Sequence, residues 1–149
     1  MGRWELGWLL RHAEGSNGYE ALAGELARYI EDQVVEWEPS GNAITPGVRE
    51  QYCCYQAIGA HAGRYMDLCL AFHGRTGDRA WLAKARAMAD TLTAAQHPDG
   101  YYPTWMDTGS FAPTAEAPFE LKGVNYGDIW PNCVSEPAAI LLQLSRYGT

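Results

Sequence analysis

Apolar residues recur every three to four positions in five stretches of this 149-residue chain. Short and long connections alternate between those stretches. A period of about 3.6 residues predicts α-helices. The predicted helices span roughly residues 3–14, 19–35, 49–73, 79–96 and 138–147, the last with a start near residues 134–137. The pattern therefore predicts an all-α fold of antiparallel helical hairpins, as a single domain over residues 1–149.

The predicted helices differ in how their apolar residues are distributed. In residues 49–73 apolar side chains occupy nearly every face, which predicts a helix buried on all sides. Residues 79–96 carry them on one face, and Asp78 is placed to cap that helix. Ser135 is the expected cap of the last helix, with Pro137 in its first turn. In the second helix the apolar positions at helical spacing are Leu22, Leu26, Tyr29, Ile30 and Val34.

The alternation of connection lengths predicts where a binding cleft lies. A short turn, residues 74–78, joins the third and fourth helices, whereas residues 36–47 and 97–133 are long and rich in Gly, Pro and aromatic residues. Antiparallel stacking of the helices brings both long connections to one end. We therefore expect a cleft at that end, beside the N-termini of the buried helices.

Part of the chain resembles a known repeating unit. The run LAFHGRTGDRAWLAKARAMADTLTAAQHPDGYYPTW, followed by WPNCVSEPAAILLQL, is similar to one hairpin and the start of the next in α/α-toroid enzymes, the six-hairpin glycosidases and their polysaccharide-lyase relatives. The resemblance covers about Leu70 to Leu144. It implies an (α/α) toroid and a carbohydrate-active function, although related hairpins carry other reactions. With about five helices the ring is incomplete, so the chain is expected to be a fragment, a self-associating unit or an open half-ring.

The residues of the second long connection suit a sugar cleft. Aromatic faces stack on sugar rings, and paired carboxylates act as acid and base at a glycosidic bond. We predict Asp107, Asp128 and Glu136 as catalytic groups, although solvated loop acids and a first-turn helix acid fit the same pattern. The predicted substrate-binding residues are Tyr52, Tyr55, Tyr102, Trp105, Tyr126 and Trp130.

Two other chemistries remain open on the sequence. Tyr52 or Tyr55 with His61 would suit a uronate lyase, although His61 also fits a hydrogen-bonded core histidine. The adjacent Cys53 and Cys54, with Cys133 and Glu136, offer three sulfurs and a carboxylate to a tetrahedral zinc ion; helical geometry and the frequency of buried cysteines weigh against it. The leading hypothesis needs no cofactor.

The charge balance limits the partners. The net charge is −7 with scattered Lys and Arg, so neither nucleic acid nor an anionic membrane is an expected partner. No signal-peptide pattern is visible, which favours a cytoplasmic location. The expected partner is a carbohydrate substrate, with a homo-oligomer or the remainder of a toroid as the protein partner. A non-catalytic helical-repeat module that binds a sugar or a protein is the main alternative to an enzyme.

Overall fold

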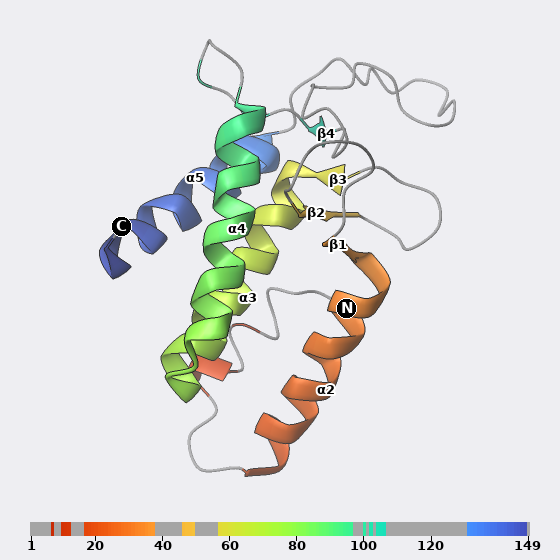
Figure 1. Cartoon of the computed structure of the whole chain (residues 1–149), viewed down its shortest axis with the longest axis vertical. Coiled ribbons are helices and arrows are strands. Elements are labelled where there is room, and N and C mark those ends of the chain that lie inside the picture. Colours follow the sequence, from red (N-terminus) through yellow and green to blue (C-terminus); the bar gives the residue numbers. More distant parts are fainter. Residues whose placement is uncertain are drawn as a thin grey trace.

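The computed structural model describes residues 17–37, 46–49, 57–96 and 131–148, together with 7, 10–12, 100, 102 and 104–106. The elements in this part of the chain are mostly α-helices, which confirms the all-α prediction (Figure 1). Their bounds are α2 Asn17–Val34, β1 Val35–Glu36, β2 Gly47–Val48, β3 Ala57–Ile58, α3 Gly59–Thr76, α4 Arg79–Ala95, β4 Trp105–Met106, α5 Pro131–Leu144 and the 3₁₀ turn η1 Ser145–Tyr147.

Helix α3 forms the centre of the molecule, as its sequence predicts. Nearly every residue from Gly59 to Phe72 is buried, including Tyr65, Met66 and Leu68, which have no exposed surface. Helices α4 and α5 pack against α3 on two sides, and α2 lies on the side opposite α5 (Figure 1). A helix with apolar residues all round is stable only when its neighbours cover it in this way.

The turn between α3 and α4 follows from two residues. Gly77 adopts the left-handed conformation, with φ 72°, and its N–H donates to the His73 carbonyl, closing α3. Asp78 then accepts a hydrogen bond from the Ala80 N–H at 2.8 Å, which confirms it as the N-cap of α4. The two helices are therefore antiparallel (Figure 1).

The described ends of both long connections lie at one end of the helices, as expected. Strand β1 pairs with β2, and β3 pairs with β4, both antiparallel. A bridge between Arg49 and Ala57 connects the two pairs, and the Gly59 N–H donates to the Thr104 carbonyl at 3.2 Å. The chain thus returns from each long connection to the N-terminal end of α3, hereafter the loop end.

Two predicted helix starts are wrong. The third helix begins at Gly59 and not near 49, because Arg49 and Ala57–Ile58 pair with neighbouring backbone; an apolar run alone does not distinguish a short buried strand from a helix. The last helix begins earlier than expected, at Pro131, so Ser135 does not cap it and Pro137 lies inside it. Pro131 itself suits a first turn, because a first-turn N–H has no helical partner to lose.

Helix α2 turns only part of its apolar positions to the core, namely Ile30 and Val34, which are partly buried. Ala23 and Ala27 face the core, whereas Leu22, Leu26 and Tyr29 are 50%, 44% and 64% exposed. Small alanine side chains permit a close approach to the rest of the molecule, and hydrophobic spacing alone did not reveal which of two adjacent faces would be used. Of the described helices, none is both long and apolar enough to cross a membrane.

The contact between α3 and α5 gives a sharp test of this architecture. A Cβ atom added at Gly63 would lie 3.0 Å from the Pro137 nitrogen and 3.2 Å from the Glu136 carbonyl carbon. Both are backbone atoms and cannot swing away. Gly63→Ala should therefore lower the free energy of unfolding by about 1–3 kcal/mol, although alanine is the better helix former.

Gly74, in the same helix, is the matched control. An added Cβ there meets nothing within 4 Å, so Gly74→Ala should raise stability by about 0.5–1 kcal/mol. Urea unfolding of both variants measures the difference. Equal stabilities for the two alanine variants would contradict the close contact between α3 and α5.

Candidate functional site

Many of the predicted site residues lie outside the part of the chain that the structure describes. This holds for the catalytic candidates Asp107 and Asp128, for the aromatic residues Tyr52, Tyr55, Tyr126 and Trp130, and for Cys53 and Cys54. Trp105 is placed by its backbone in β4, at the loop end. The predicted residues with described side chains are Tyr102, Cys133 and Glu136.

Glu136 forms a two-point ion pair with Arg64. The Arg64 Nε donates to Oε2 at 2.8 Å and Nη2 donates to Oε1 at 3.0 Å, so each carboxylate oxygen of Glu136 accepts a guanidinium N–H. The Glu136 side chain is 15% exposed and the Arg64 side chain is 26% exposed. Planar bidentate pairs of this kind are strong and fix the orientation of both groups. The pair joins α5 to the second turn of α3, and sequence reasoning did not identify Arg64.

Cys133 and Thr104 lie beside this pair, and Tyr102 lies two residues before Thr104. Tyr102 and Thr104 precede β4 and are almost fully buried, and Cys133, one turn before Glu136, has no exposed surface. Burial raises the pKa of the Cys133 thiol, although hydrogen bonds with the Ala60 backbone and the Thr104 side chain act in the opposite direction. Burial also raises the pKa of Tyr102. We call Arg64, Thr104, Cys133 and Glu136 the rim cluster.

The described residues of the rim cluster do not form a metal site. Among the residues that the structure describes, no group of three His, Cys, Asp or Glu side chains converges. The zinc hypothesis depends on Cys53 and Cys54 and stays a prediction. His61 lies one turn before Arg64, is half-buried, and has Nδ1 3.4 Å from the Arg49 carbonyl oxygen, as a hydrogen-bonded core histidine would.

A second polar cluster, which sequence reasoning missed, joins three helices. Glu31 of α2 accepts a hydrogen bond from the Tyr65 hydroxyl of α3 and another from Lys84 of α4, whose Nζ lies 2.5 Å away. The Lys84 ammonium also lies 4.4 Å from the Trp81 ring centre and 5.7 Å from that of Trp37, within range of cation–π attraction. Because one Glu31 oxygen accepts from both Tyr65 and Lys84, this cluster ties α2 to α3 and α4, which points to a structural role.

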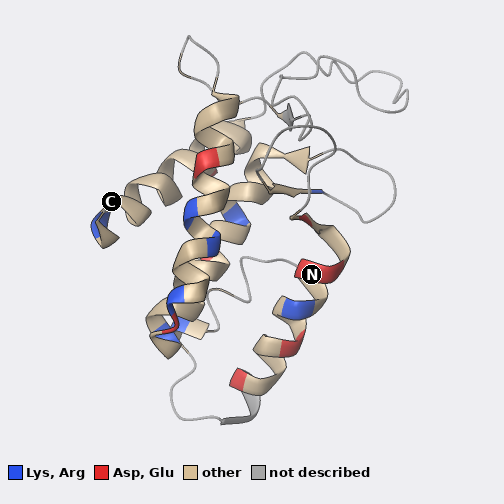
Figure 2. Ribbon diagram, in the orientation of Figure 1, with Lys and Arg blue, Asp and Glu red and all other residues tan. Residues whose placement is uncertain are grey.

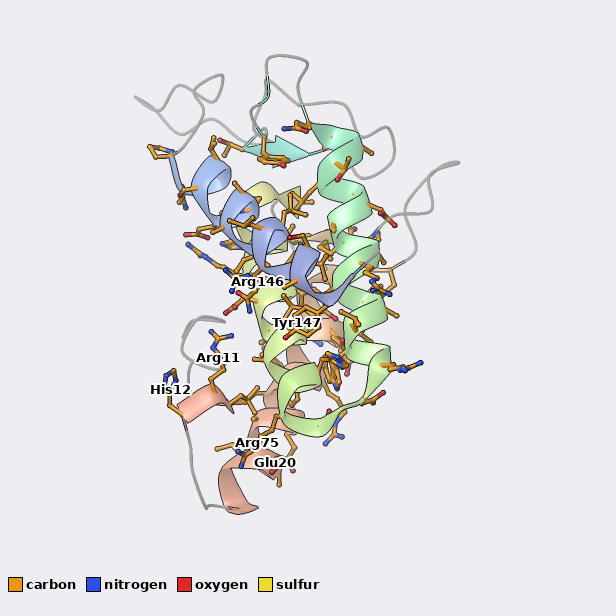
Figure 3. All side chains as sticks on the ribbon, turned by 90° about the vertical axis from the view of Figure 1, so that its left-hand side faces the viewer. Arg11, His12, Glu20, Arg75, Arg146 and Tyr147 are labelled. Carbon is orange, nitrogen blue, oxygen red and sulfur yellow. The ribbon has the colours of Figure 1, made fainter. Side chains whose placement is uncertain are left out.

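A third polar region lies at the end of α3 away from the loop end. An open cavity of about 310 Å³ is lined by Arg11 and Arg75, with Gln143, Tyr147 and an apolar floor. Both arginines have an acidic partner: Arg11 binds the buried Asp67 through two 2.9 Å hydrogen bonds, and Arg75 lies 3.7 Å from Glu20 (Figure 3). Their charge is therefore largely balanced within the protein.

Comparison with known proteins does not assign the chain to a family. No protein-family model, no curated protein and no solved structure matches it.

The buried ionisable groups of α3 predict a dependence of stability on alkaline pH. Burial raises the pKa of Cys69 to about 12 and raises that of Tyr65 well above its ordinary value. The folded state therefore retains protons that the unfolded chain releases near pH 9 and 10. Stability should be fully present below about pH 9 and should fall as the pH rises, by about 1.4 kcal/mol per pH unit for each such proton.

Urea unfolding between about pH 8 and 10 measures this slope. Cys69→Ala is the control, because it removes one of the two protons and should make the decline between about pH 9 and 10 shallower. A wild-type stability that stays level over that interval would contradict the burial of these groups in α3.

Proposed function

We propose that this chain is a carbohydrate-active domain of the α/α-toroid type, a glycoside hydrolase or polysaccharide lyase, with its sugar cleft at the loop end. The observation that carries the proposal is the hydrogen bond from Gly59 to Thr104, together with the β3–β4 pairing. These contacts anchor the aromatic and acidic connection after α4 against the N-terminal end of the central helix. In an antiparallel hairpin fold, that is the end at which a cleft can form.

The chemistry of the loop end supports a sugar ligand. Sugars are bound by aromatic faces and by charged groups that hold hydroxyls, and the connection after α4 supplies Trp105, Tyr126 and Trp130 as candidate stacking residues. The rim cluster adds a fixed Arg64–Glu136 pair, and Tyr102 lies buried near the start of that connection. A bidentate arginine–carboxylate pair presents remaining lone pairs and N–H groups in a rigid arrangement, which suits recognition of hydroxyl or carboxylate groups.

The geometry also divides the roles of the three predicted acids. Both oxygens of Glu136 accept hydrogen bonds from Arg64, so Glu136 fits a binding and positioning role better than proton transfer. Asp107 and Asp128 then remain the candidate acid and base. Hydrolysis with retention of configuration would need a carboxylate separation of about 5 Å, and inversion about 6.5–9.5 Å. For a lyase, Tyr52 or Tyr55 would act as the base.

A non-catalytic sugar-binding module is the second candidate. The pairing of Glu136 with Arg64 favours it, because the one described carboxylate of the predicted catalytic set has its charge balanced within the protein. In this case the aromatic residues and the rim cluster would bind a sugar without breaking a bond.

Turnover and binding of neutral and uronate-containing oligosaccharides test the proposal and separate the two candidates. An enzyme should release reducing ends, or unsaturated ends in the case of a lyase. Asp107→Asn or Asp128→Asn should lower kcat by at least about a hundredfold, since positioned acid or base groups contribute that much, with little change in sugar affinity. Glu136→Gln should mainly weaken binding.

Asp90→Asn is the control, because Asp90 is exposed on α4 beside the far half of α5 and should leave both readouts unchanged. Binding without turnover would identify the module. The absence of both binding and turnover across the panel would contradict a carbohydrate function.

A further inference from the structure

The outward face of α5 lacks the charged residues that a solvent-facing helix normally has. Between Pro131 and Tyr147 the chain has two charged residues, Glu136 and Arg146, and Glu136 is paired with Arg64. Most of the α5 ribbon in Figure 2 is uncharged, with blue near its C-terminal end. The face opposite the buried side is small and apolar, with Leu142 66% exposed. Its other exposed members are Pro131, Ser135, Ala138 and Ala139. Surface helices usually present a polar face there, so this face is suited to contact with another helix.

The outward face of α2 has the opposite shape. Leu22, Leu26 and Tyr29 project at intervals of four and three residues, the spacing of residues along a helix–helix seam. Glu25 and Asp32 are exposed along the outer flank of this stripe, together with one basic residue, Arg28. Three large apolar side chains aligned on one exposed helix face are typical of a protein interface.

The two faces are complementary in size and in charge. The largest side chain of the α2 stripe, Tyr29, can lie over the small Ala138 and Ala139 of α5, and Leu26 can pack on the exposed Leu142. Arg146, exposed in η1 directly after α5 (Figure 3), is opposite in sign to Glu25 and Asp32, the two acidic residues on the flank of α2. In an antiparallel pairing, Leu142 meets Leu26, Ala139 meets Tyr29, and Arg146 comes to the turn that carries Leu22 and Glu25.

These faces cannot pair within one chain, because α2 and α5 lie on opposite sides of α3 (Figure 1). We propose that the outward face of α5 in one copy docks against the outward face of α2 in a second copy. Such a contact is heterologous, because it joins two different faces: each copy uses its α5 face with one neighbour and its α2 face with another. Successive contacts therefore close a ring or extend a chain of copies. Because α2 and α5 run in opposite directions within one copy, antiparallel docking keeps the loop ends of neighbouring copies on the same side.

Solution mass tests the contact directly. The wild-type chain should associate with increasing concentration to multiples of its 16.5 kDa mass, measured by light scattering or sedimentation. Leu26→Glu blocks the α2 face and Leu142→Glu blocks the α5 face, and each should be monomeric alone. Mixed together, these variants should form a 1:1 heterodimer and nothing larger, because one intact face of each kind remains. Ala83→Glu, exposed on α4, is the matched control and should associate like the wild type.

A charge exchange tests the register. Glu25→Arg or Arg146→Glu should each raise the dissociation constant by at least about threefold, and the double variant should recover part of that loss. Both residues are exposed, so thermal unfolding of the variants should match the wild type.

Three results would overturn the proposal. The first is a wild-type chain that stays monomeric at the highest soluble concentration. The second is a Leu142→Glu variant that still associates, which would indicate pairing of two α2 faces. The third is a pair of blocked variants that do not combine on mixing.

Discussion

The burial of α3 on every side is the constraint on which the other elements depend. Its side chains from Gly59 to Phe72 leave it no polar face, so α4, α5 and α2 have to cover it together. Burying a large apolar side chain contributes roughly 1.5–3 kcal/mol, and α3 buries several that have no exposed surface. This requirement also determines where the loop end lies. The neighbours cover α3 in antiparallel orientation, so both long connections come to the N-terminal end of α3.

Ion pairs then specify how each neighbour sits on α3, more than they add to stability. Arg64 binds Glu136 of α5, Asp67 binds Arg11 of the N-terminal segment, and Tyr65 shares Glu31 with Lys84. Partly buried pairs offset much of their attraction by the loss of hydration, so their net contribution to stability is small. Removing one partner, however, leaves a charge without compensation. Each pair therefore disfavours alternative packings of its helix.

The parts of the fold that follow from local rules were predictable from the sequence. The amphipathic pattern of α4 and its Asp78 cap depend on residues close in sequence, and the structure confirms both. The turn at Gly77 is explained in the same way by a local residue that adopts a positive φ. The start of α3 and the rotation of α2 depend on distant partners, namely Thr104 and Lys84, so spacing alone did not reveal them. The same reason explains why Glu136 was identified as a candidate but Arg64 was not. An arginine gains its role only from the carboxylate that the fold brings to it.

The rotation of α2 about its axis explains both the polar cluster around Glu31 and the apolar stripe on the outside of this helix. Residues in a helix are about 100° apart, so turning Leu22 and Leu26 onto α3 would carry Glu31 to the solvent side. That rotation would bury apolar surface, but the buried Tyr65 hydroxyl would lose its carboxylate acceptor, at a cost of about 1–3 kcal/mol. It would also separate Glu31 from Lys84. The same rotation would replace the buried Ala23 and Ala27 with larger side chains. The polar cluster around Glu31 and the two alanines thus select one face of α2 for the core. The apolar stripe that remains on the outside of α2 is a consequence of that selection. On the opposite side of the molecule, the one carboxylate of α5 is paired with Arg64, so the outward face of α5 is uncharged.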